Sequence, residues 1–289
     1  IFNTTYDYKL GLSATPERRG DFGFEEVLLK HLGNVIYSYS YSDARDDGII
    51  PPYRLKRIAV PLTFQERNNY DYYSKKIKKV ATMLFQRYPS LEGVVDNYFF
   101  KQLGKIHKRT SDDLIEKYTA LVNKRKGIVH TSETKIMTLK YLIQNEIDTR
   151  ARILIFHERT VYADRINDFL HQEGINSAVY HTKIDTEERR KNLQDFRDGN
   201  INILITCRAL DEGLDVPDTS VGIIVAATSS VRQRVQRIGR ILRKAPGKDF
   251  SEIYTIYIDG IEDDIFSKRD LRILEKSAQK IEKVQMGFN

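Results

Sequence analysis

The sequence predicts an α/β fold in which helices cover both faces of a parallel sheet. From Gly127 onward, apolar runs of strand length alternate with segments of helical periodicity. This alternation favours parallel pairing, because a helix between two strands returns the chain to the same edge of the sheet. A long helical stretch precedes this region and follows an earlier strand pattern, which indicates a helical insertion in the α/β unit.

The composition is that of an ordinary globular protein and excludes several other classes. Of the 289 residues, 40% are hydrophobic and 30% are charged, so a full core in more than one lobe is expected. The longest apolar run, Val221 to Ala227, is far too short to span a bilayer, so no membrane partner is expected. The single cysteine, Cys207, excludes an internal disulfide and fits a reducing intracellular, cytoplasmic setting. The histidines have no ligand spacing with cysteines or carboxylates, so no metal site is predicted.

The N-terminal part of the chain contains short elements and turn signals. A strand is expected at Tyr8–Leu12, followed by a turn that contains Ser13 and Thr15. The chain starts without methionine, inside what reads as a domain, so we expect it to be a piece of a longer protein. Residues 21–52 read as a connector with glycine and proline breakers, and Arg54–Val60 alternates polar and apolar side chains like a half-buried strand.

The helical insertion carries most of the positive charge of the chain. The periodicity is helical from Phe64 to Lys126, with breaks expected at Pro89, Gly93 and Gly104. Between residues 74 and 126, thirteen basic side chains face five acidic ones, a net charge of +8 against +7 for the whole chain. A solvated helical face is the ordinary explanation for such charge. Its density, together with aromatic residues, also suits an arm that binds nucleic-acid phosphates.

In the α/β unit after the insertion, periodicity and capping residues predict where the helices and strands lie. A helix capped by Thr131 or Ser132 is expected to begin the unit, and a charged amphipathic helix is expected to fill residues 261–289. The other expected helices are Thr160–Gln172 and Asp185–Arg197. The expected strands are Arg152–Phe156, Ser177–Tyr180, Ile203–Ile205, Val221–Ala227 and Ile253–Ile258.

A stretch near the C-terminal end of the unit has the chemistry of a phosphate-binding site. Arg237, Arg240 and Arg243 recur every three residues, so they share one helical face and can converge on one target. Guanidinium groups bind phosphoryl oxygens with two parallel hydrogen bonds. Gly239 between these arginines costs a helix about 1 kcal/mol against alanine, which indicates a close approach to another surface. Asp215, in a glycine-containing loop after a strand, is placed to accept hydrogen bonds from a ribose.

Four segments resemble motifs of the superfamily 2 helicases and translocases, in the order found there. GLSATP (11–16) resembles motif III, ILIFHE (153–158) motif IV, TCRALDEGLDVP (206–217) motif V and QRIGRILR (236–243) motif VI. GLSATPER followed by a connector and then YRLKRIAVPLTFQER (53–67) is similar to the XPB-like branch. The chain departs from XPB proper just after motif III, where it reads ERRGD (17–21) in place of an Arg-Glu-Asp signature.

The resemblance implies a RecA-like fold and a division into parts. Residues 1–20 would end a first RecA-like domain, and residues 21–52 would connect it to a second one at 53–260. The insertion at 74–126 would correspond to a helical thumb. The N-terminal RecA-like lobe of the same parent would be a partner, and would supply most of the binding site for ATP and Mg²⁺. Neither a GxxxxGK[ST] loop nor an acidic Mg²⁺ motif occurs in the sequence, so we expect this chain alone to be inactive as an ATPase.

The resemblance also implies roles for individual residues. Arg240 and Arg243 would act as arginine fingers toward the γ-phosphate of ATP, supported by Gln236 and Arg237. Gly213 would let the backbone approach the nucleotide, and Asp215 would bind its ribose. The motif containing Ser13 and Thr15 would couple hydrolysis to movement between the lobes; a plain turn before Pro16 is the competing interpretation.

The nucleic-acid contacts implied by the resemblance have ordinary structural alternatives. Thr206 would contact a nucleic-acid phosphate, although a capped strand end explains it nearly as well. Arg159 and His181 follow strands of the sheet and are weaker candidates, for which a structural role is favoured. On the insertion, the candidate contacts are Lys75, Lys76, Lys78 and Lys79.

The function predicted from the sequence is the C-terminal motor portion of an ATP-dependent DNA helicase or translocase. It would act on double- or single-stranded DNA. One alternative is the motor part of a restriction or phage-defence enzyme, which shares all four motifs. Another is a nucleic-acid-binding lobe that never meets ATP, which the pair Arg240 and Arg243 argues against because simple binding does not require it.

Overall fold

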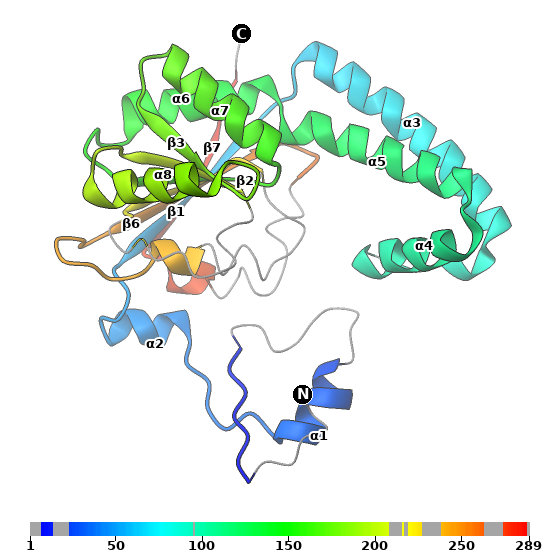
Figure 1. Cartoon of the computed structure of the whole chain (residues 1–289), viewed down its shortest axis with the longest axis horizontal. Coiled ribbons are helices and arrows are strands. Elements are labelled where there is room, and N and C mark those ends of the chain that lie inside the picture. The colour runs from blue at the N-terminus through cyan, green and yellow to red at the C-terminus, as the bar shows by residue number, and fades with distance from the viewer. Residues whose placement is uncertain are drawn as a thin grey trace.

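The computed structural model describes residues 7–13, 23–94, 96–207, 216, 219–226, 238–262 and 274–287. In this part of the chain seven strands form one parallel sheet, in the order β3-β4-β2-β5-β6-β1-β7 (Figure 1). The strands are β1 (Tyr53–Val60), β2 (Ile153–His157), β3 (Ser177–Tyr180), β4 (Ile203–Cys207), β5 (Val221–Ile224), β6 (Ser251–Ile258) and β7 (Lys280–Gln285). The predicted parallel α/β sheet is confirmed.

Helices lie on both faces of the sheet, and three of them form an arm that projects away from it (Figure 1). Helical elements before β1 are η1 (Phe24–Leu28), α1 (Leu29–Leu32) and α2 (Tyr41–Asp46). The arm consists of α3 (Phe64–Arg87), η2 (Pro89–Leu91), α4 (Asp96–Thr110) and α5 (Asp113–His130). The remaining helical elements are α6 (Glu133–Tyr141), η3 (Leu142–Glu146), α7 (Thr160–Gln172) and α8 (Thr186–Asp198).

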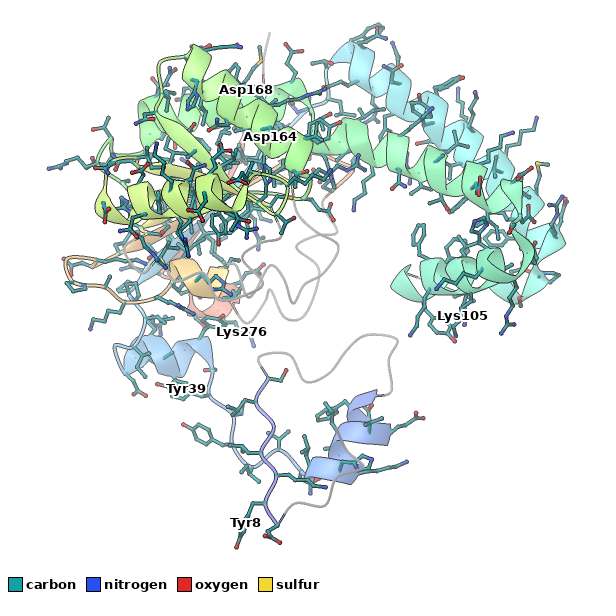
Figure 2. All side chains as sticks on the ribbon, in the orientation of Figure 1. Tyr8, Tyr39, Lys105, Asp164, Asp168 and Lys276 are labelled. Carbon is teal, nitrogen blue, oxygen red and sulfur yellow. The ribbon has the colours of Figure 1, made fainter. Side chains whose placement is uncertain are left out.

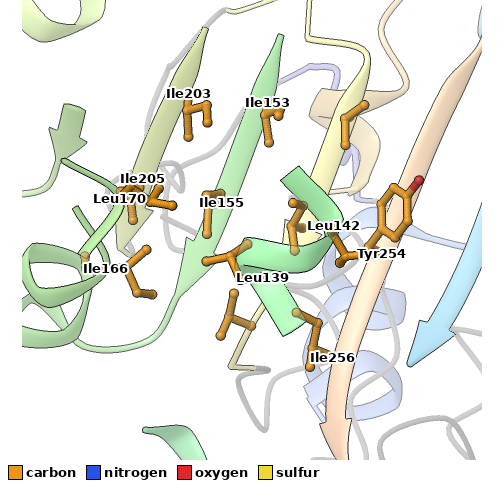
Figure 3. Close-up of a cluster of buried hydrophobic side chains, with 14 of the residues drawn as sticks. Leu139, Leu142, Ile153, Ile155, Ile166, Leu170, Ile203, Ile205, Tyr254 and Ile256 are labelled. Atoms are coloured by element: carbon orange, nitrogen blue, oxygen red, sulfur yellow. The ribbon is translucent and has the colours of Figure 1, made fainter. Parts of the chain in front are cut away.

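One face of the sheet is covered by α6 and α7. Leu139 and Leu142 pack over strands β2, β4 and β6, and Ile166 and Leu170 of α7 complete the cluster (Figure 3). The strands supply β-branched side chains, which fill a buried parallel sheet closely. This cluster fixes α6 and α7 against the sheet.

The other face is covered by α8, by a helical turn at residues 238–241, and by α2. Phe196, Ile238 and Ile241 are buried there, and Tyr41 of α2 packs against them. The helical turn approaches β5 so closely that a Cβ added at Gly222 would lie 1.9 Å from Cδ1 of Ile241. A glycine in β5 is therefore what allows the turn to sit on the sheet.

The arm has a small hydrophobic core of its own. Helices α3 and α5 pack side by side, and α4 folds back beside their outer ends (Figure 1). Phe99 of α4 is buried at this end, with its ring edge-on to those of Phe85 and Tyr118. The described residues of this core, beyond those three, include Val80, Leu84, Leu91, Leu103, Leu114 and Ile115.

One carboxylate joins the helices at the outer end of the arm. Asp112 caps α5 by accepting from the backbone N–H of Leu114 at 2.8 Å, and also accepts from Tyr88 at 2.5 Å and Arg87 at 2.8 Å. These hydrogen bonds, that from Tyr88 foremost, lower the pKa of Asp112 to about 2. The end of α3 and the start of α5 are thereby held together.

The order of the strands places a topological switch at β2. The chain runs from β2 through β3 and β4 on one side of β2, and then continues with β5 and β6 on the other side. In open parallel sheets, ligands bind in the crevice outside the carboxyl ends of the strands at such a point. The carboxyl end of β2 is therefore where a site is expected.

Two expectations about individual elements are wrong. Gly104 does not break the insertion but lies inside α4, because the neighbouring Phe99 and Leu103 bury against the arm core and outweigh the cost of the glycine. The break comes at Ser111, whose φ is +47°, and at the cap Asp112. Residues 7–13 form no strand, and large side chains at Tyr8 and Leu12 are 95% and 89% exposed.

The predicted C-terminal helix over 261–289 is wrong at residues 280–285, whereas residues 274–277 are helical and 263–273 lie outside the described residues. Residues Lys280–Gln285 form β7, which pairs in parallel with β1 at the edge of the sheet. The edge of β1 presents backbone N–H and C=O groups that need partners, and this requirement outweighs helix propensity. In the strand, Glu282 lies 3.7 Å from Arg54, so charges that suggested a solvated helix form cross-strand pairs.

We expect Gly222→Ala to destabilise the protein by about 1–3 kcal/mol, because the added Cβ overpacks the fully buried Ile241. Urea unfolding measures the change. Gly104→Ala is the matched control: no atom lies within 4 Å of its added Cβ, so it should stabilise α4 by about 0.5–1 kcal/mol. A Gly222→Ala protein as stable as the unmodified one would contradict the close packing of residues 238–241 on β5.

Candidate functional site at the carboxyl edge of the sheet

The carboxyl ends of the strands gather polar side chains around the switch point. Strand β2 ends at His157, β4 at Cys207 after Thr206, and the chain turns at His181 after β3. Thr206 is 1% exposed, and its Oγ1 has no hydrogen-bond partner among the described residues. A buried hydroxyl without a partner is costly, so Thr206 is a candidate to bind a group supplied from outside this part of the chain.

The described part of the arginine segment is a helical turn over residues 238–241. Arg240 is half-buried and Arg243 is exposed, while Ile238 and Ile241 are buried against the sheet. The turn therefore has one face toward the core and presents arginines elsewhere. Of the residues predicted around it, Gly213, Asp215, Gln236 and Arg237 lie outside the described residues.

A buried lysine caps this turn, and the sequence analysis missed it. Lys248 is 6% exposed and donates to the carbonyl oxygens of Ile241 and, at 2.8 Å, of Arg243. A cation at a helix C-terminus satisfies orphan carbonyls and complements the helix dipole. The only signal in the sequence was a lysine five residues after Arg243, and lysines are so common on surfaces that it carries little information.

Gly239 makes the close approach that its position in the helix suggested. A Cβ at Gly239 would lie 2.9 Å from the hydroxyl of Tyr41, in α2. Nearby, Arg45 of α2 donates to the carbonyl oxygen of Ser277 at 2.9 Å, and Lys244 donates to that of Gly48 at 3.1 Å. The segment before β1 is thus packed directly against the arginine turn.

The two weaker candidates have structural partners. His181 is fully buried, its Nε2 donates to Asp164 of α7 at 2.7 Å, and its Nδ1 accepts from the backbone of Lys183 (Figure 2 labels Asp164). This supports the structural role favoured for His181. Arg159 is half-buried and donates to the carbonyl oxygen of Asn123 in α5 at 3.3 Å, so its side chain lies against the arm.

Of the two residues expected to couple hydrolysis to movement between the lobes, the structure describes one. Ser13 is exposed at the end of the segment 7–13, and Thr15 lies outside the described residues. Among the described residues, no group of three or more His, Cys, Asp or Glu side chains is placed to hold a metal ion.

The four lysines predicted on the insertion all face solvent. Lys75, Lys76, Lys78 and Lys79 are exposed, whereas Ile77 between them is buried against α5. The Nζ atom of Lys76 lies 4.3 Å from the centre of the Tyr72 ring, a cation–π arrangement. The face is therefore solvated and also free to meet a polyanion.

Helix α4 adds a second basic surface, which we call the α4 strip. Its residues follow one another at i, i+4 and i+7, so they share one side of the helix, and residues 97–111 contain no acidic side chain. Figure 2 shows Lys105 on α4. The exposed side chains of the strip are Lys101, Lys105, Lys108 and Arg109.

Known protein families include matches to this sheet and to its motifs. Residues 134–245 match the family described as helicase conserved C-terminal domain. The chain is also 33% identical over 237 residues to "DNA 3'-5' translocase XPB2" of Sulfurisphaera tokodaii, covering 82% of this chain and 50% of that protein. The chain contains a superfamily 2 helicase C-terminal domain. Its RecA-like α/β architecture and its resemblance to the XPB-like branch are thus confirmed.

Two further proteins are similar to parts of this chain. "DEAD-box ATP-dependent RNA helicase 22" of Oryza sativa subsp. japonica is 31% identical over 167 residues, which is 55% of this chain and 28% of that protein. A fragment of a putative HsdR subunit of a type I restriction enzyme from Vibrio vulnificus has a TM-score of 0.56 at 17% identity, covering 94% of this chain and 43% of that one. The likeness to the HsdR fragment shows a shared fold.

The chain spans about half the length of the translocase and less than a third of the RNA helicase. Within the helicase C-terminal domain, the described motif V residue Thr206 lies at the end of β4, and the motif VI arginines Arg240 and Arg243 follow β5. The described helices include none that is both long enough and apolar enough to cross a bilayer.

The stability of the helicase C-terminal domain should fall as the pH drops below about 6.5. Burial lowers the pKa of His157 to about 4, whereas the unfolded chain titrates near 6.5. Because the unfolded state binds the proton first, stability is complete above pH 6.5 and is lost progressively toward pH 4, by up to about 1.4 kcal/mol per pH unit for one proton. Urea unfolding between pH 7.5 and 4.5 measures this slope.

His157→Gln should flatten that slope by about one proton, because it removes the buried titrating group. His31→Gln, which changes an exposed histidine outside the sheet, serves as the control and should leave the slope unchanged. An unchanged slope in His157→Gln would show that His157 is not the neutral buried group inferred here.

Proposed function

We propose that this chain is the C-terminal motor portion of an ATP-dependent DNA helicase or translocase. The observation that carries the proposal is the placement of motif V and VI residues and of a basic arm on one α/β unit. In this arrangement the unit supplies arginine fingers toward ATP and part of the track for the nucleic acid. The N-terminal RecA-like lobe of the parent is the proposed partner across the nucleotide.

The arginines are proposed to act on the γ-phosphate of ATP. Guanidinium groups of Arg240 and Arg243 would neutralise charge that develops on the phosphoryl oxygens, with Gln236 and Arg237 in support. The cap by Lys248 and the packing of Ile241 on Gly222 support this role, because they hold the turn that carries the arginines. Gly213 and Asp215 are proposed to meet the nucleotide itself.

The other lobe is proposed to supply what this chain lacks. Mg²⁺, when bound with ATP, would neutralise part of the charge of the phosphates. The phosphate cradle for both belongs to the N-terminal lobe in this proposal, so the isolated chain would not hydrolyse ATP. Ser13 and Thr15 are proposed to couple hydrolysis to movement between the two lobes.

The nucleic acid is proposed to run along the carboxyl edge of the sheet and the arm. Thr206 and Arg159 would flank it at the sheet, and the exposed lysines of α3 would meet its phosphates. The α4 strip supports this, since it adds four exposed basic side chains without an acid between them. DNA is proposed over RNA because the match to the DNA translocase spans 82% of the chain, against 55% for the RNA helicase.

In the intact parent, Arg240→Ala or Arg243→Ala should lower ATP turnover by about 10³ or more while leaving nucleotide binding largely intact. Arg190→Ala, which removes an exposed arginine of α8, is the control and should leave turnover unchanged. Steady-state hydrolysis and nucleotide affinity are measured side by side. Turnover within a few-fold of the unmodified protein in both variants would favour a nucleic-acid-binding lobe that never meets ATP.

Replacing Lys75, Lys76, Lys78 and Lys79 together with glutamine should weaken DNA binding equally on all sequences, because phosphate contacts carry no base information. It should also flatten the dependence of log affinity on log salt by about 0.9 for each duplex phosphate no longer neutralised. Salt titrations on one duplex in the intact parent measure both effects.

A matched control replaces four exposed basic residues with glutamine: Arg150, which lies before β2 at the opposite edge of the sheet, and Arg190, Lys191 and Arg197 of α8. It changes the net charge equally and should leave the slope as it is. If the arm variant and the unmodified protein gave the same slope, the α3 face would be only a solvated surface.

A further inference from the structure

The inner end of the arm is joined to the sheet at the turn that follows β2. The last turns of α5 lie against three successive residues, His157, Glu158 and Arg159, which occupy the carboxyl end of the strand at the topological switch. We define these three residues as the β2 turn. Each of them bonds to α5 by a different group.

The first contact of the β2 turn uses a neutral histidine. Nε2 of His157 donates to the carbonyl oxygen of His130, the last residue of α5, at 2.9 Å, while its Nδ1 accepts from the backbone N–H of Arg159 at 3.1 Å. One nitrogen must be protonated and the other not, which fixes the tautomer. Burial of His157, which lowers its pKa to about 4, keeps it in this form at neutral pH.

The second contact is a nearly buried carboxylate. Glu158 is 9% exposed, and its Oε2 lies 3.0 Å from Nζ of Lys126 and 3.3 Å from Nδ1 of the buried His130. Nζ of Lys126 donates to this carboxylate, which water barely reaches, so Glu158 binds α5 at Lys126. Arg159 adds a side-chain donation to Asn123, one turn earlier in α5, at 3.3 Å.

The inner end of α3 is held separately, and also by one carboxylate. Glu66 accepts from the backbone of Thr63 at 3.0 Å, from Ser132 at 2.9 Å and from the backbone of Glu133 at 2.9 Å. It therefore caps α3 and the start of α6 together. With α3 tied to α6, a rotation of the arm about its inner end is resisted chiefly where α5 meets the β2 turn.

We infer that Glu158 is a positioning residue that fixes the direction of the arm relative to the carboxyl edge of the sheet. It does so through Lys126, and the β2 turn thereby links the carboxyl edge of the sheet to the arm. The inference rests on the proposed function for what the arm binds, but not for how the arm is held. No contact of Glu158 with nucleic acid or nucleotide is needed.

The test measures the spread of arm positions in the full-length protein. Spin labels are attached to cysteines introduced at Lys117 of α5 and Lys191 of α8, both exposed, while Cys207 is buried at 2% exposure. Glu158→Gln keeps the size of the side chain and removes its charge. It should broaden the distribution of distances between the labels at least two-fold, with α3–α5 helicity unchanged by circular dichroism.

Two further variants, a second change in the same pair and a control, test the same inference. Lys126→Met removes the more exposed partner and should broaden the distribution in the same direction if Glu158→Gln fails to fold. Glu187→Gln removes a carboxylate from a fully solvated pair with Arg190 on α8 and should change nothing. A distribution as narrow in Glu158→Gln and Lys126→Met as in the unmodified protein would overturn the inference.

A functional readout separates this inference from the proposed function. Stimulation of ATP turnover by saturating duplex DNA should fall at least ten-fold in Glu158→Gln, with turnover in the absence of DNA unchanged. If the distribution broadens while the four-lysine variant keeps its full salt slope, the arm is held as inferred but is not the DNA contact. If the distribution stays narrow while that slope flattens, the DNA role stands and Glu158 does not position the arm.

Discussion

The arrangement of this molecule depends on the pairing of β1 with β6 rather than with β2. Strand β1 runs in register with β6 along its whole length, so β5 and β6 lie between it and β2, the next strand along the chain. The connection from β1 to β2 must cross these strands, and its last helix, α6, does so on one face. Thr134 at the start of α6 donates to Pro61, just after β1, at 2.6 Å, and Lys135 pairs with Glu262, just after β6, at 2.6 Å. Helix α6 therefore starts at the carboxyl edge, and the arm that precedes it has both inner ends at that edge.

This topology explains why the basic arm and the proposed phosphate-binding segment lie at the same edge of the sheet. In a parallel sheet the loops at the carboxyl edge are the ones available for ligands, since both faces are buried under helices. An insertion between β1 and α6 opens on the same edge as the loops after β4 and β5. Strand order thus places the proposed nucleotide contacts and the proposed nucleic-acid contacts at the same edge of the sheet.

The sequence predicts the local elements of this domain well and its long-range contacts poorly. Thr160–Gln172 and Ser177–Tyr180 have the predicted bounds, because their periodicity and flanking residues agree with the sheet they join. β7 was missed because a strand with four exposed residues of six gains its stability from the edge of β1, about 220 residues earlier in the chain. The bonds of Glu66, Glu158 and Lys248 were missed for a similar reason. A charged side chain is usually solvated, and nothing local reveals that the fold buries it beside a helix end.

The arm has a packed outer end and a hydrogen-bonded inner end. Its shape and its direction therefore depend on different contacts, whereas in a single rigid helix they would depend on the same ones. The outer end has its own core around Phe99 and its own cap at Asp112, so the basic surfaces of α3 and α4 keep their shape whatever happens at the sheet. Among the described residues, its inner end is bonded to the rest of the domain by Glu66, through three hydrogen bonds, and by the pair of Glu158 with Lys126. Bonds of this kind can be exchanged at modest cost, whereas a hydrophobic core cannot be remade in part. A domain built in this way can redirect its arm as a unit without unfolding it, which is what a motor that moves along a charged track requires.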